Sequence, residues 1–468
     1  MLARLGRRTV IAGAVAIAVL LAAGATVLIL GPSGVRDLVV EPSTPAPTAP
    51  RPSPTTVPPA LDDPGGSAKP ATATAVRDRL RGLLDNRALG KRFGAYVVDP
   101  ATGHVLLQRR ADQPATPAST AKLSTATAAL RALGPQHRLK TTVERSGHTI
   151  ILVGGGDVTL RGPGKHPDEP TYPEFASLAA LAKQTSANLD RSAKVRVRID
   201  DSLYTGPRTA PGWKPNYVPE GDVAPVSALT IDEGRKDPRE GARYSDPALS
   251  AGQAFAQLLE KRGVTVRGQV SRAETPDAAK KVAKVSSPTI AQLVEYMLTH
   301  SDNDIAETLV RQVALAKGKP ASFHGASAAV DAVLAQMGLA KGITLYDGSG
   351  LSTKDKVTPK ALTGLLRAAA SGKHPKLRAV LSGLPVGGFS GTLATRFGEQ
   401  GAGAGAGAVR AKTGTLDGVS SLAGYVRGTD GRVLVFAFVA NGVPSGATWR
   451  SRIVLDKLAA RLAGCGCN

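Results

Sequence analysis

The sequence predicts an α/β fold in which one antiparallel β-sheet is flanked by helices. Near the C-terminus, three strand-like segments follow one another with glycines between them, a pattern typical of an antiparallel meander. Two further strand-like segments, closer to the N-terminus, are joined by a Thr102-Gly103 turn. Apolar residues recur at helical spacing in segments between these groups. With 468 residues and 42% apolar content, the chain is long enough for two or three domains.

The elements of this sheet and its helices follow in chain order. We expect a helix over 76–84, strands over 95–99 and 105–109, a helix that opens at Ser119, a strand around Lys412, strands over 419–427 and 432–440, and a final helix over 448–462. Further strands are expected over 149–153, 195–199 and 264–270, with helices over 175–189 and 250–262. These extra elements predict one or more accessory domains inserted at 141–285 into a catalytic domain made of 76–140 and 286–468.

Three short motifs carry the chemistry of the chain. They are Ser119-Thr120-Ala121-Lys122, Ser301-Asp302-Asn303 and Lys412-Thr413-Gly414, in that order. A lone Ser-x-x-Lys pattern is expected by chance about once in a chain of this length, so it is weak by itself. The three together are the signature of class A β-lactamases and penicillin-binding proteins, which use a serine nucleophile.

The first motif predicts a nucleophile and its base. Pro117 is a helix-start signal, and positions i and i+3 of a helix share a face, so Lys122 would project beside Ser119. Burial and a second nearby cation, Lys412, would lower the pKa of Lys122 enough for it to act as a base. The helix N-terminus would also offer N–H groups to an oxyanion. The alternative is an ordinary helix start with a solvated lysine.

The second motif lies between two segments of helical periodicity. A polar triplet at such a place is usually a cap or a turn. In the functional interpretation, Ser301 relays a proton between base and leaving group, and Asn303 hydrogen-bonds the substrate amide and Lys122. Asp302 would cap the following helix.

The third motif reads as a strand that holds the substrate. Lys412 and Thr413 would bind a substrate carboxylate, and the Thr415 N–H would complete an oxyanion hole with that of Ser119. Gly414 inside the strand marks the close approach of a ligand backbone. The alternative is an edge strand with a solvated lysine.

With these residues placed, the chain resembles the class C low-molecular-mass penicillin-binding proteins of the penicillin-binding protein 4 type, peptidase family S13. The resemblance runs from about Arg77 to about Leu462 and includes the strings 154–160, 347–352 and 391–393. It implies a β-lactamase/transpeptidase-like catalytic domain. It also places Asp157 near the substrate side chain, although a Gly-Gly-Gly-Asp run is equally typical of a plain turn.

The resemblance implies a serine-type D-Ala-D-Ala carboxypeptidase that needs no metal or cofactor. Ser119 would attack the terminal D-Ala-D-Ala bond of a peptidoglycan stem peptide, and penicillins would stall the enzyme as acyl-enzyme. Endopeptidase activity on D-Ala cross-links stays open. The alternatives are a β-lactamase or esterase of the same superfamily and a non-catalytic penicillin-binding wall sensor.

The N-terminus predicts export. Residues 1–8 are basic, and the uncharged apolar run 9–30 would reach about 33 Å as a helix, enough for a bilayer. We expect a signal anchor with a cytoplasmic N-terminus and an extracytoplasmic catalytic domain, or alternatively a cleaved export signal. Residues 31–75, rich in proline, would form a linker between membrane and body.

The formal net charge of +22 is spread along the chain and belongs to no nucleic-acid module. Export also argues against nucleic acid as a partner, whereas anionic wall polymers or lipid headgroups fit the charge. The alternating Gly and Ala residues of 401–408 indicate a flexible loop. The two cysteines, Cys465 and Cys467, fit no zinc spacing and favour a disulfide in an oxidising compartment.

Overall fold

The computed structural model describes residues 71–163, 172–190 and 193–465. The helices are α2 Ala73–Leu84, α3 Lys122–Ala132, α4 Leu178–Ala187, α5 Pro247–Glu260, α6 Ile290–His300, α7 Asn303–Ala316, α8 Phe323–Gln336, α9 Pro359–Ala370, α10 Arg378–Ser382 and α11 Thr448–Ala463. The longer strands are β1 Arg92–Val98, β2 Val105–Arg109, β3 Arg138–Ser146, β4 Thr149–Val153, β5 Lys194–Asp200, β8 Lys280–Thr289, β11 Val409–Leu416, β12 Val419–Arg427 and β13 Val433–Asn441. Short strands are β6 Thr265–Val266, β7 Ser271–Arg272, β9 Ile343–Thr344 and β10 Lys356–Val357.

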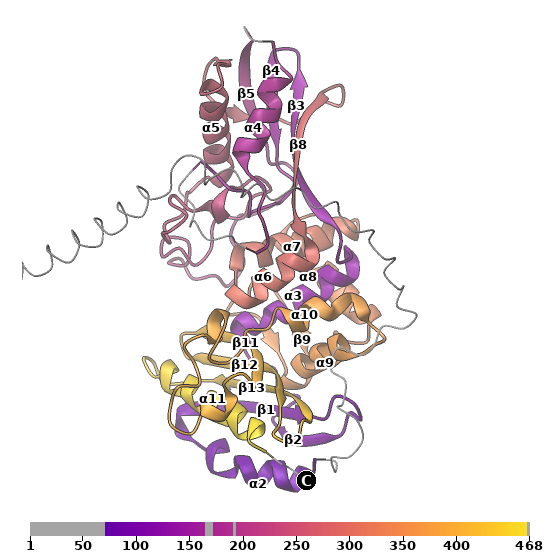
Figure 1. Ribbon diagram of the computed structural model, residues 1–468, viewed down its shortest axis with the longest axis vertical. Coiled ribbons are helices and arrows are strands. Elements are labelled where there is room, and N and C mark those ends of the chain that lie inside the picture. Colours follow the sequence, from indigo (N-terminus) through magenta and orange to yellow (C-terminus); the bar gives the residue numbers. More distant parts are fainter. Residues whose placement is uncertain (1–70, 164–171, 191–192, 466–468) are drawn as a thin grey trace, which may run out of the picture. The chain divides into compact units, whose positions relative to one another are not determined.

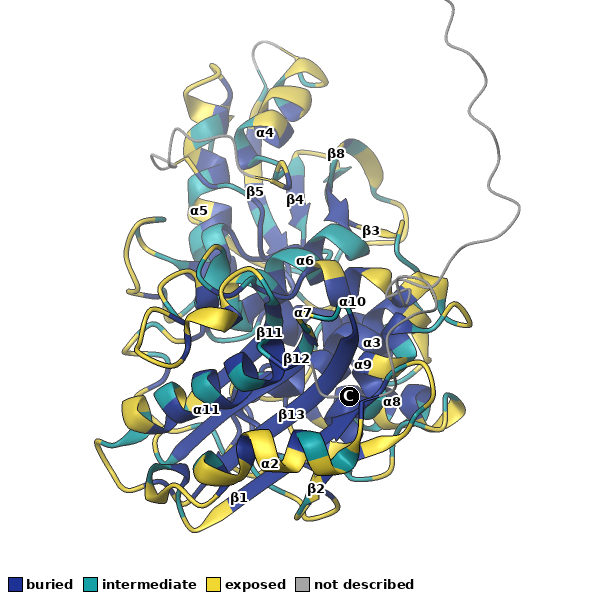
Figure 2. Cartoon of the chain, turned by 60° about the horizontal axis from the view of Figure 1, so that its bottom comes forward, coloured by how far each residue is buried: buried dark blue, intermediate teal, exposed yellow. Residues whose placement is uncertain are grey.

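The first sheet has five strands in the order β11-β12-β13-β1-β2, all antiparallel (Figure 1). The predicted joining of the N-terminal hairpin to the C-terminal meander is therefore confirmed, through the pairing of β1 with β13. Strand β13 is buried at every position, as Figure 2 shows, because helices cover both faces of the sheet.

The two faces of this sheet belong to two apolar cores. Along β13, Phe436 and Phe438 pack with residues of α2 and α11. Val435 and Ala437 alternate with them and pack with residues of α3, α6, α7, α8 and α9. Side chains of successive strand residues point to opposite faces, so this alternation divides the two cores. Helix α3 is buried from Lys122 to Leu130 and places the first motif at the centre of the second core.

A second sheet of six strands forms between residues 138 and 289. Its order is β6-β5-β4-β3-β8 with β7 also paired to β5, and its β4–β5 and β5–β6 pairs are parallel. Helices α4 and α5 contribute to its core. The prediction of a strand over 264–270 is wrong in length, because only Thr265–Val266 form a strand there. Gly268, with a positive φ of 72°, then turns the chain.

The N-terminal predictions fall largely outside the described residues. This applies to 1–8, to the apolar run 9–30 and to most of the linker 31–75. Helix α2 begins at Ala73, three residues before the expected start, because Thr72 caps it by accepting a hydrogen bond from the Ala75 N–H. Within the described part of the chain, every helix is too short or too polar to cross a bilayer.

Candidate active site

The nucleophile candidate lies just before α3 rather than inside it. Ser119 belongs to a 3₁₀ turn over Ala118–Ala121, and α3 begins only at Lys122, so the helix expected from Ser119 starts three residues late. Ala118 has a positive φ of 49°, which a regular helix does not allow. Positions i and i+3 eclipse in a 3₁₀ turn, and the Lys122 Nζ still lies 3.0 Å from the Ser119 Oγ.

Lys122 is fully buried and surrounded by acceptors. Besides Ser119 it contacts the Asn303 Oδ1 at 2.6 Å and the Ser349 carbonyl oxygen at 2.7 Å. Burial lowers the pKa of Lys122 to about 8, although the carboxylates of Asp347 and Asp302 act in the opposite direction. Burial, one of the two predicted causes, is thus the largest influence on the pKa of Lys122, and the repulsion between the two lysines lowers the pKa of Lys412.

The second motif lies in the junction between α6 and α7. Ser301 ends α6 in the left-handed conformation, with φ 62°, and its Oγ accepts a hydrogen bond from the Lys412 Nζ at 2.8 Å. Asp302 caps α7 by accepting from the Ile305 N–H at 2.7 Å, as predicted. The Asn303 Nδ2 donates to the Asp222 carbonyl at 2.8 Å, so both ends of this amide are held.

The third motif lies on β11, the edge strand of the first sheet. Lys412 is fully buried, and both burial and the nearby Lys122 lower its pKa. The Thr413 Oγ1 donates to the Thr392 Oγ1 at 2.8 Å. A Cβ on Gly414 would lie 2.7 Å from the Pro117 carbonyl oxygen and 3.1 Å from the Ser119 nitrogen. Glycine at position 414 is thus required by its close contact with the turn that carries Ser119. The next residue of the strand, Thr415, is exposed.

Sequence reasoning missed the backbone groups that hold Lys122 and Asn303. The Ser349 carbonyl belongs to the string 347–352, which the resemblance singled out without a role. The Ser349 and Gly348 N–H groups both donate to the buried Glu307 carboxylate, at 2.9 and 3.1 Å. Arg311 lies 3.7 Å from the same carboxylate, so the Gly348–Ser349 backbone is hydrogen-bonded to a member of a buried ion pair.

Asp157 lies in a buried turn and makes its hydrogen bonds within that turn. Its Oδ1 accepts from the Thr159 N–H at 3.0 Å and the Thr159 Oγ1 at 2.6 Å, while its Oδ2 has no hydrogen-bond partner among the described residues. Burial raises the pKa of Asp157 to about 6. None of these bonds joins it to the serine and lysine residues above.

One group of carboxylates has the spacing of metal ligands. Oxygens of Glu233, Asp302 and Asp304 lie within 4.8 Å of one another. Arginines already engage two of the three, since Arg235 donates to Glu233 at 2.7 Å and Arg243 lies 3.1 Å from Asp304. The cluster therefore has the chemistry of an ion-pair network rather than of an open cation site.

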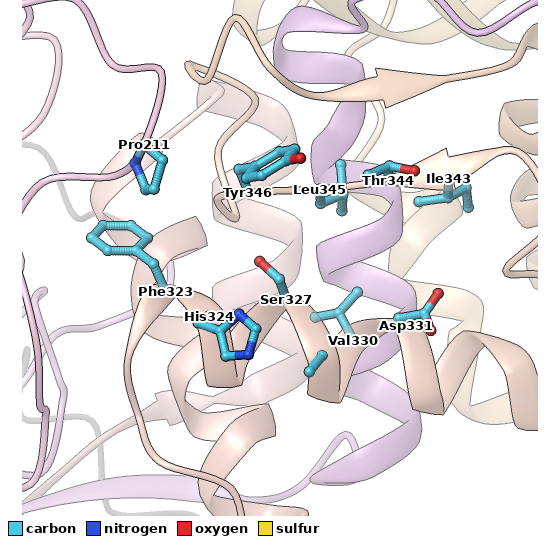
Figure 3. Close-up of a pocket in the computed structure, with 11 residues that line it drawn as sticks. Pro211, Phe323, His324, Ser327, Val330, Asp331, Ile343, Thr344, Leu345 and Tyr346 are labelled. Atoms are coloured by element: carbon cyan, nitrogen blue, oxygen red, sulfur yellow. The ribbon is translucent and has the colours of Figure 1, made fainter.

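An apolar cavity of about 450 Å³ lies between α8 and the segment Ile343–Tyr346. Figure 3 shows Phe323, His324 and Ser327 of α8 facing Tyr346 across it. No residue of the three motifs lines this cavity. Its lining is mainly apolar but includes His324 and Asp331, and it is separate from the serine and lysine constellation.

The fold and the meeting of the three motifs define the chain as a serine enzyme of the β-lactamase and penicillin-binding protein class. Residues 76–242 and 236–462 match the D-Ala-D-Ala carboxypeptidase 3 (S13) family, and the chain belongs to that family. The predicted family is thus confirmed, and with it the class of serine DD-peptidase.

Relatives along most of the chain agree. The chain is 40% identical over 426 residues to Carboxypeptidase DacB of Mycolicibacterium smegmatis. The aligned region covers 88% of this chain and 90% of that protein. It is 30% identical over 492 residues to a D-alanyl-D-alanine carboxypeptidase of an Actinomadura species, and this alignment covers 86% of this chain and 87% of that protein. The crystal structure of penicillin binding protein 4 (dacB) from Haemophilus influenzae has the same fold, with a TM-score of 0.68, 23% identity, and coverage of 82% of this chain and 97% of that one.

Proposed function

We propose that the chain cleaves the terminal D-Ala-D-Ala bond of peptidoglycan stem peptides through an acyl-enzyme on Ser119. The observation that supports this most is the set of hydrogen bonds around Lys122. A neutral amine has two N–H bonds and one lone pair. The Asn303 Oδ1 and the Ser349 carbonyl, at 2.6 and 2.7 Å, accept the two N–H bonds, which leaves the lone pair for the Ser119 hydroxyl at 3.0 Å.

Acylation follows from this arrangement. The Ser119 Oγ attacks the carbonyl carbon of the scissile D-Ala-D-Ala bond while Lys122 takes the hydroxyl proton. The backbone N–H groups of Ser119 and Thr415 receive the oxyanion. Ser301 then gives its hydroxyl proton to the departing D-Ala nitrogen and takes up the proton held by Lys122, so that Lys122 returns to its neutral form. The hydrogen bond that the Ser301 Oγ accepts from the Lys412 Nζ at 2.8 Å supports this role. Water finally releases the shortened peptide from Ser119.

Lys412 and Thr413 bind the carboxylate of the terminal D-alanine. Lys412 is buried, so its ammonium interacts more strongly with a carboxylate than a solvated lysine would. We also propose that Asp157 faces the substrate side chain. This is supported by its Oδ2 atom, which has no hydrogen-bond partner among the described residues. Penicillins mimic the D-Ala-D-Ala dipeptide and acylate the same serine.

The decisive experiment compares Ser119→Ala with wild type in fluorescent penicillin labelling and in D-alanine release from a D-Ala-D-Ala pentapeptide. Both are expected to vanish in the variant. Ser124→Ala is a matched control, because Ser124 is a buried serine of α3 whose hydroxyl has no hydrogen-bond partner among the described residues. Labelling that survives Ser119→Ala refutes the assignment of the nucleophile.

The same assay separates the related activities. Rapid turnover of penicillin would indicate a β-lactamase, and labelling without D-alanine release would indicate a wall sensor. A cross-linked stem-peptide dimer, added as a second substrate, measures endopeptidase activity.

We also propose that the catalytic body acts outside the cytoplasmic membrane. In this proposal residues 9–30 form a signal anchor, residues 31–75 a linker and residues 141–285 an inserted accessory domain. Membrane fractionation combined with N-terminal sequencing of the mature protein tests the anchor. An N-terminus beyond residue 30 in the soluble fraction would show that the segment is instead a cleaved signal.

A further inference from the structure

An arginine-lined cleft of about 1050 Å³ lies beside β11, upstream of Lys412. Three guanidinium groups from different elements line it: Arg378 of α10, Arg410 of β11 and Arg427 of β12. No aspartate or glutamate is among the lining residues. The lining is therefore rich in positive charge, and the nearby carboxylate of Glu295 is engaged by the hydroxyl of the lining residue Ser382.

The register of the sheet puts the cleft on the face that carries Lys412. Arg410 pairs with Tyr425 across the β11–β12 ladder, and cross-strand partners share a face. Arg427 follows Tyr425 by two residues, and Lys412 follows Arg410 by two, so all four side chains lie on that face. Arg410 and Lys412 are then separated by roughly 7 Å along the strand.

The charges of Arg410 and Arg427 are not balanced by carboxylates. Within the described ranges, no aspartate or glutamate forms an ion pair with either guanidinium. The Arg427 Nη1 donates only to the Gly431 carbonyl, at 3.4 Å. Burial raises the pKa of Tyr425, which therefore keeps its proton and offers a neutral O–H donor between the two arginines.

The cleft has room for more than a single small ion. Its lining also includes Ala404, Ala406, Gly407 and Ala408 from one segment and Gly428 and Thr429 from another. These side chains are small, so the volume between the arginines is unfilled. A Cβ on Gly407 would lie 3.6 Å from the ring of Phe389, which is 71% exposed.

We propose that this cleft binds a phosphodiester-bearing segment of a cell-envelope polymer. A tetrahedral phosphate presents oxygens in several directions and suits guanidinium groups that come from three elements, whereas a planar carboxylate presents two. A lipid headgroup is less suitable, because the exposed ring of Phe389 alone offers little apolar surface for insertion into a bilayer. Binding here would retain the polymer next to the strand that carries Lys412. The proposal rests on the proposed location outside the membrane.

The test measures binding of a synthetic poly(glycerol phosphate) oligomer to the full chain by isothermal titration calorimetry at about 0.15 M ionic strength. The double variant Arg410→Gln/Arg427→Gln is expected to bind at least about tenfold more weakly than wild type. Arg196→Gln/Arg198→Gln is the matched control, since it also removes two arginines from a sheet, one exposed and one half-buried, and should change the affinity less than about twofold.

Three outcomes would overturn the proposal. These are an equal loss in both double variants, equally tight binding of poly-glutamate of the same charge, and binding through these arginines only to phosphatidylglycerol vesicles. Circular dichroism and the rate of penicillin labelling are measured on every variant to recognise a folding defect. If the wild-type protein releases D-alanine but does not bind the polymer, the cleft proposal alone is refuted. If it binds the polymer but does not release D-alanine, the proposed peptidase function alone is refuted.

Discussion

At the scale of single residues, Lys122 combines burial with three acceptors. The acceptors favour the charged ammonium, while burial favours the neutral amine and prevails, since the pKa falls to about 8. A lysine in this range is neutral often enough near physiological pH to serve as a base, and it remains strong enough to take a proton from serine.

The pH dependence of acylation follows from this pKa. Below about 7 the neutral fraction of Lys122 grows about tenfold per pH unit, and above about 8 it levels off. We expect the second-order rate of acylation by penicillin to follow that curve in stopped-flow fluorescence. In Lys122→Arg the guanidinium stays charged, so acylation should be slow at every pH. A flat wild-type profile between about pH 6 and 9 would contradict the role of Lys122.

Gly414 gives a second prediction for a single residue. In Gly414→Ala the added Cβ would meet the Ser421 Oγ at 2.2 Å and the Pro117 carbonyl oxygen at 2.7 Å, which pushes β11 away from the nucleophile turn. We expect acylation at least about tenfold slower and a free energy of unfolding lower by about 1–3 kcal/mol. Gly398→Ala, where the Cβ meets no atom within 4 Å, is the control. Equal behaviour of the two variants would refute the steric argument.

At the scale of elements, the junction between α6 and α7 sets the position of the second motif. A capping box at Thr289 and Gln292 starts α6, and the left-handed Ser301 ends it. Asp302 then starts α7, whose residues are buried from Asp304 to Ala314. The two ends of this junction are fixed by packed helices, and the short link between them presents Ser301 and Asn303 to the two lysines.

The cap of α7 can be tested separately from the charge of Asp302. We expect Asp302→Ala to lower the free energy of unfolding by about 1 kcal/mol, because the Ile305 N–H loses its acceptor. Asp302→Asn also removes the charge but keeps an oxygen acceptor, so its stability in urea denaturation should lie within a few tenths of a kcal/mol of wild type. The cap interpretation is wrong if both variants lose the same amount.

At the scale of the whole described chain, residues from 222–243 hold helix α7, which carries the candidate residue Asn303. The Ala224 N–H donates to the Asp304 Oδ1 at 2.8 Å, and Arg243 pairs with the other oxygen of that carboxylate. The Asp222 carbonyl holds Asn303. The segment between the first two motifs is therefore part of the scaffold of the site, whatever else it binds.

Glu233, buried in this contact, predicts a pH dependence of stability. Burial, followed by the nearby Asp302, raises the pKa of its carboxyl from 4.5 to about 8, although Arg235, which donates a hydrogen bond to it, acts in the opposite direction. A raised folded-state pKa means that proton binding stabilises the fold fully below 4.5 and that this contribution is lost as pH rises through about 8.

The variant Glu233→Gln lacks this titration. Its free energy of unfolding, relative to wild type, is therefore expected to rise between about pH 5 and pH 8, as measured by urea denaturation at both values. Glu295→Gln serves as control, because it changes a carboxylate of α6 that accepts a hydrogen bond from the hydroxyl of the exposed Ser382. A relative stability that falls over the same range would contradict the assignment.

The sequence by itself determined most of the elements, though not all of their bounds, together with the order of the motifs and the spacing of Ser119 and Lys122, because periodicity and residue type are local properties of the chain. It also predicted the family, and correctly the cap formed by Asp302. It failed at Ser119, where the positive φ of Ala118 delays the helix, and it did not foresee that Gly414 also lies close to the turn that carries Ser119.

Only the tertiary structure decided which groups surround the base. The Ser349 and Asp222 carbonyls are backbone atoms, which every residue type carries, so no pattern in the sequence singles them out. The burial that lowers the pKa of Lys122 is likewise a sum over side chains distant in sequence. The motifs identify the candidate reacting groups, and the packing of α3, α7 and β11 sets their geometry and protonation.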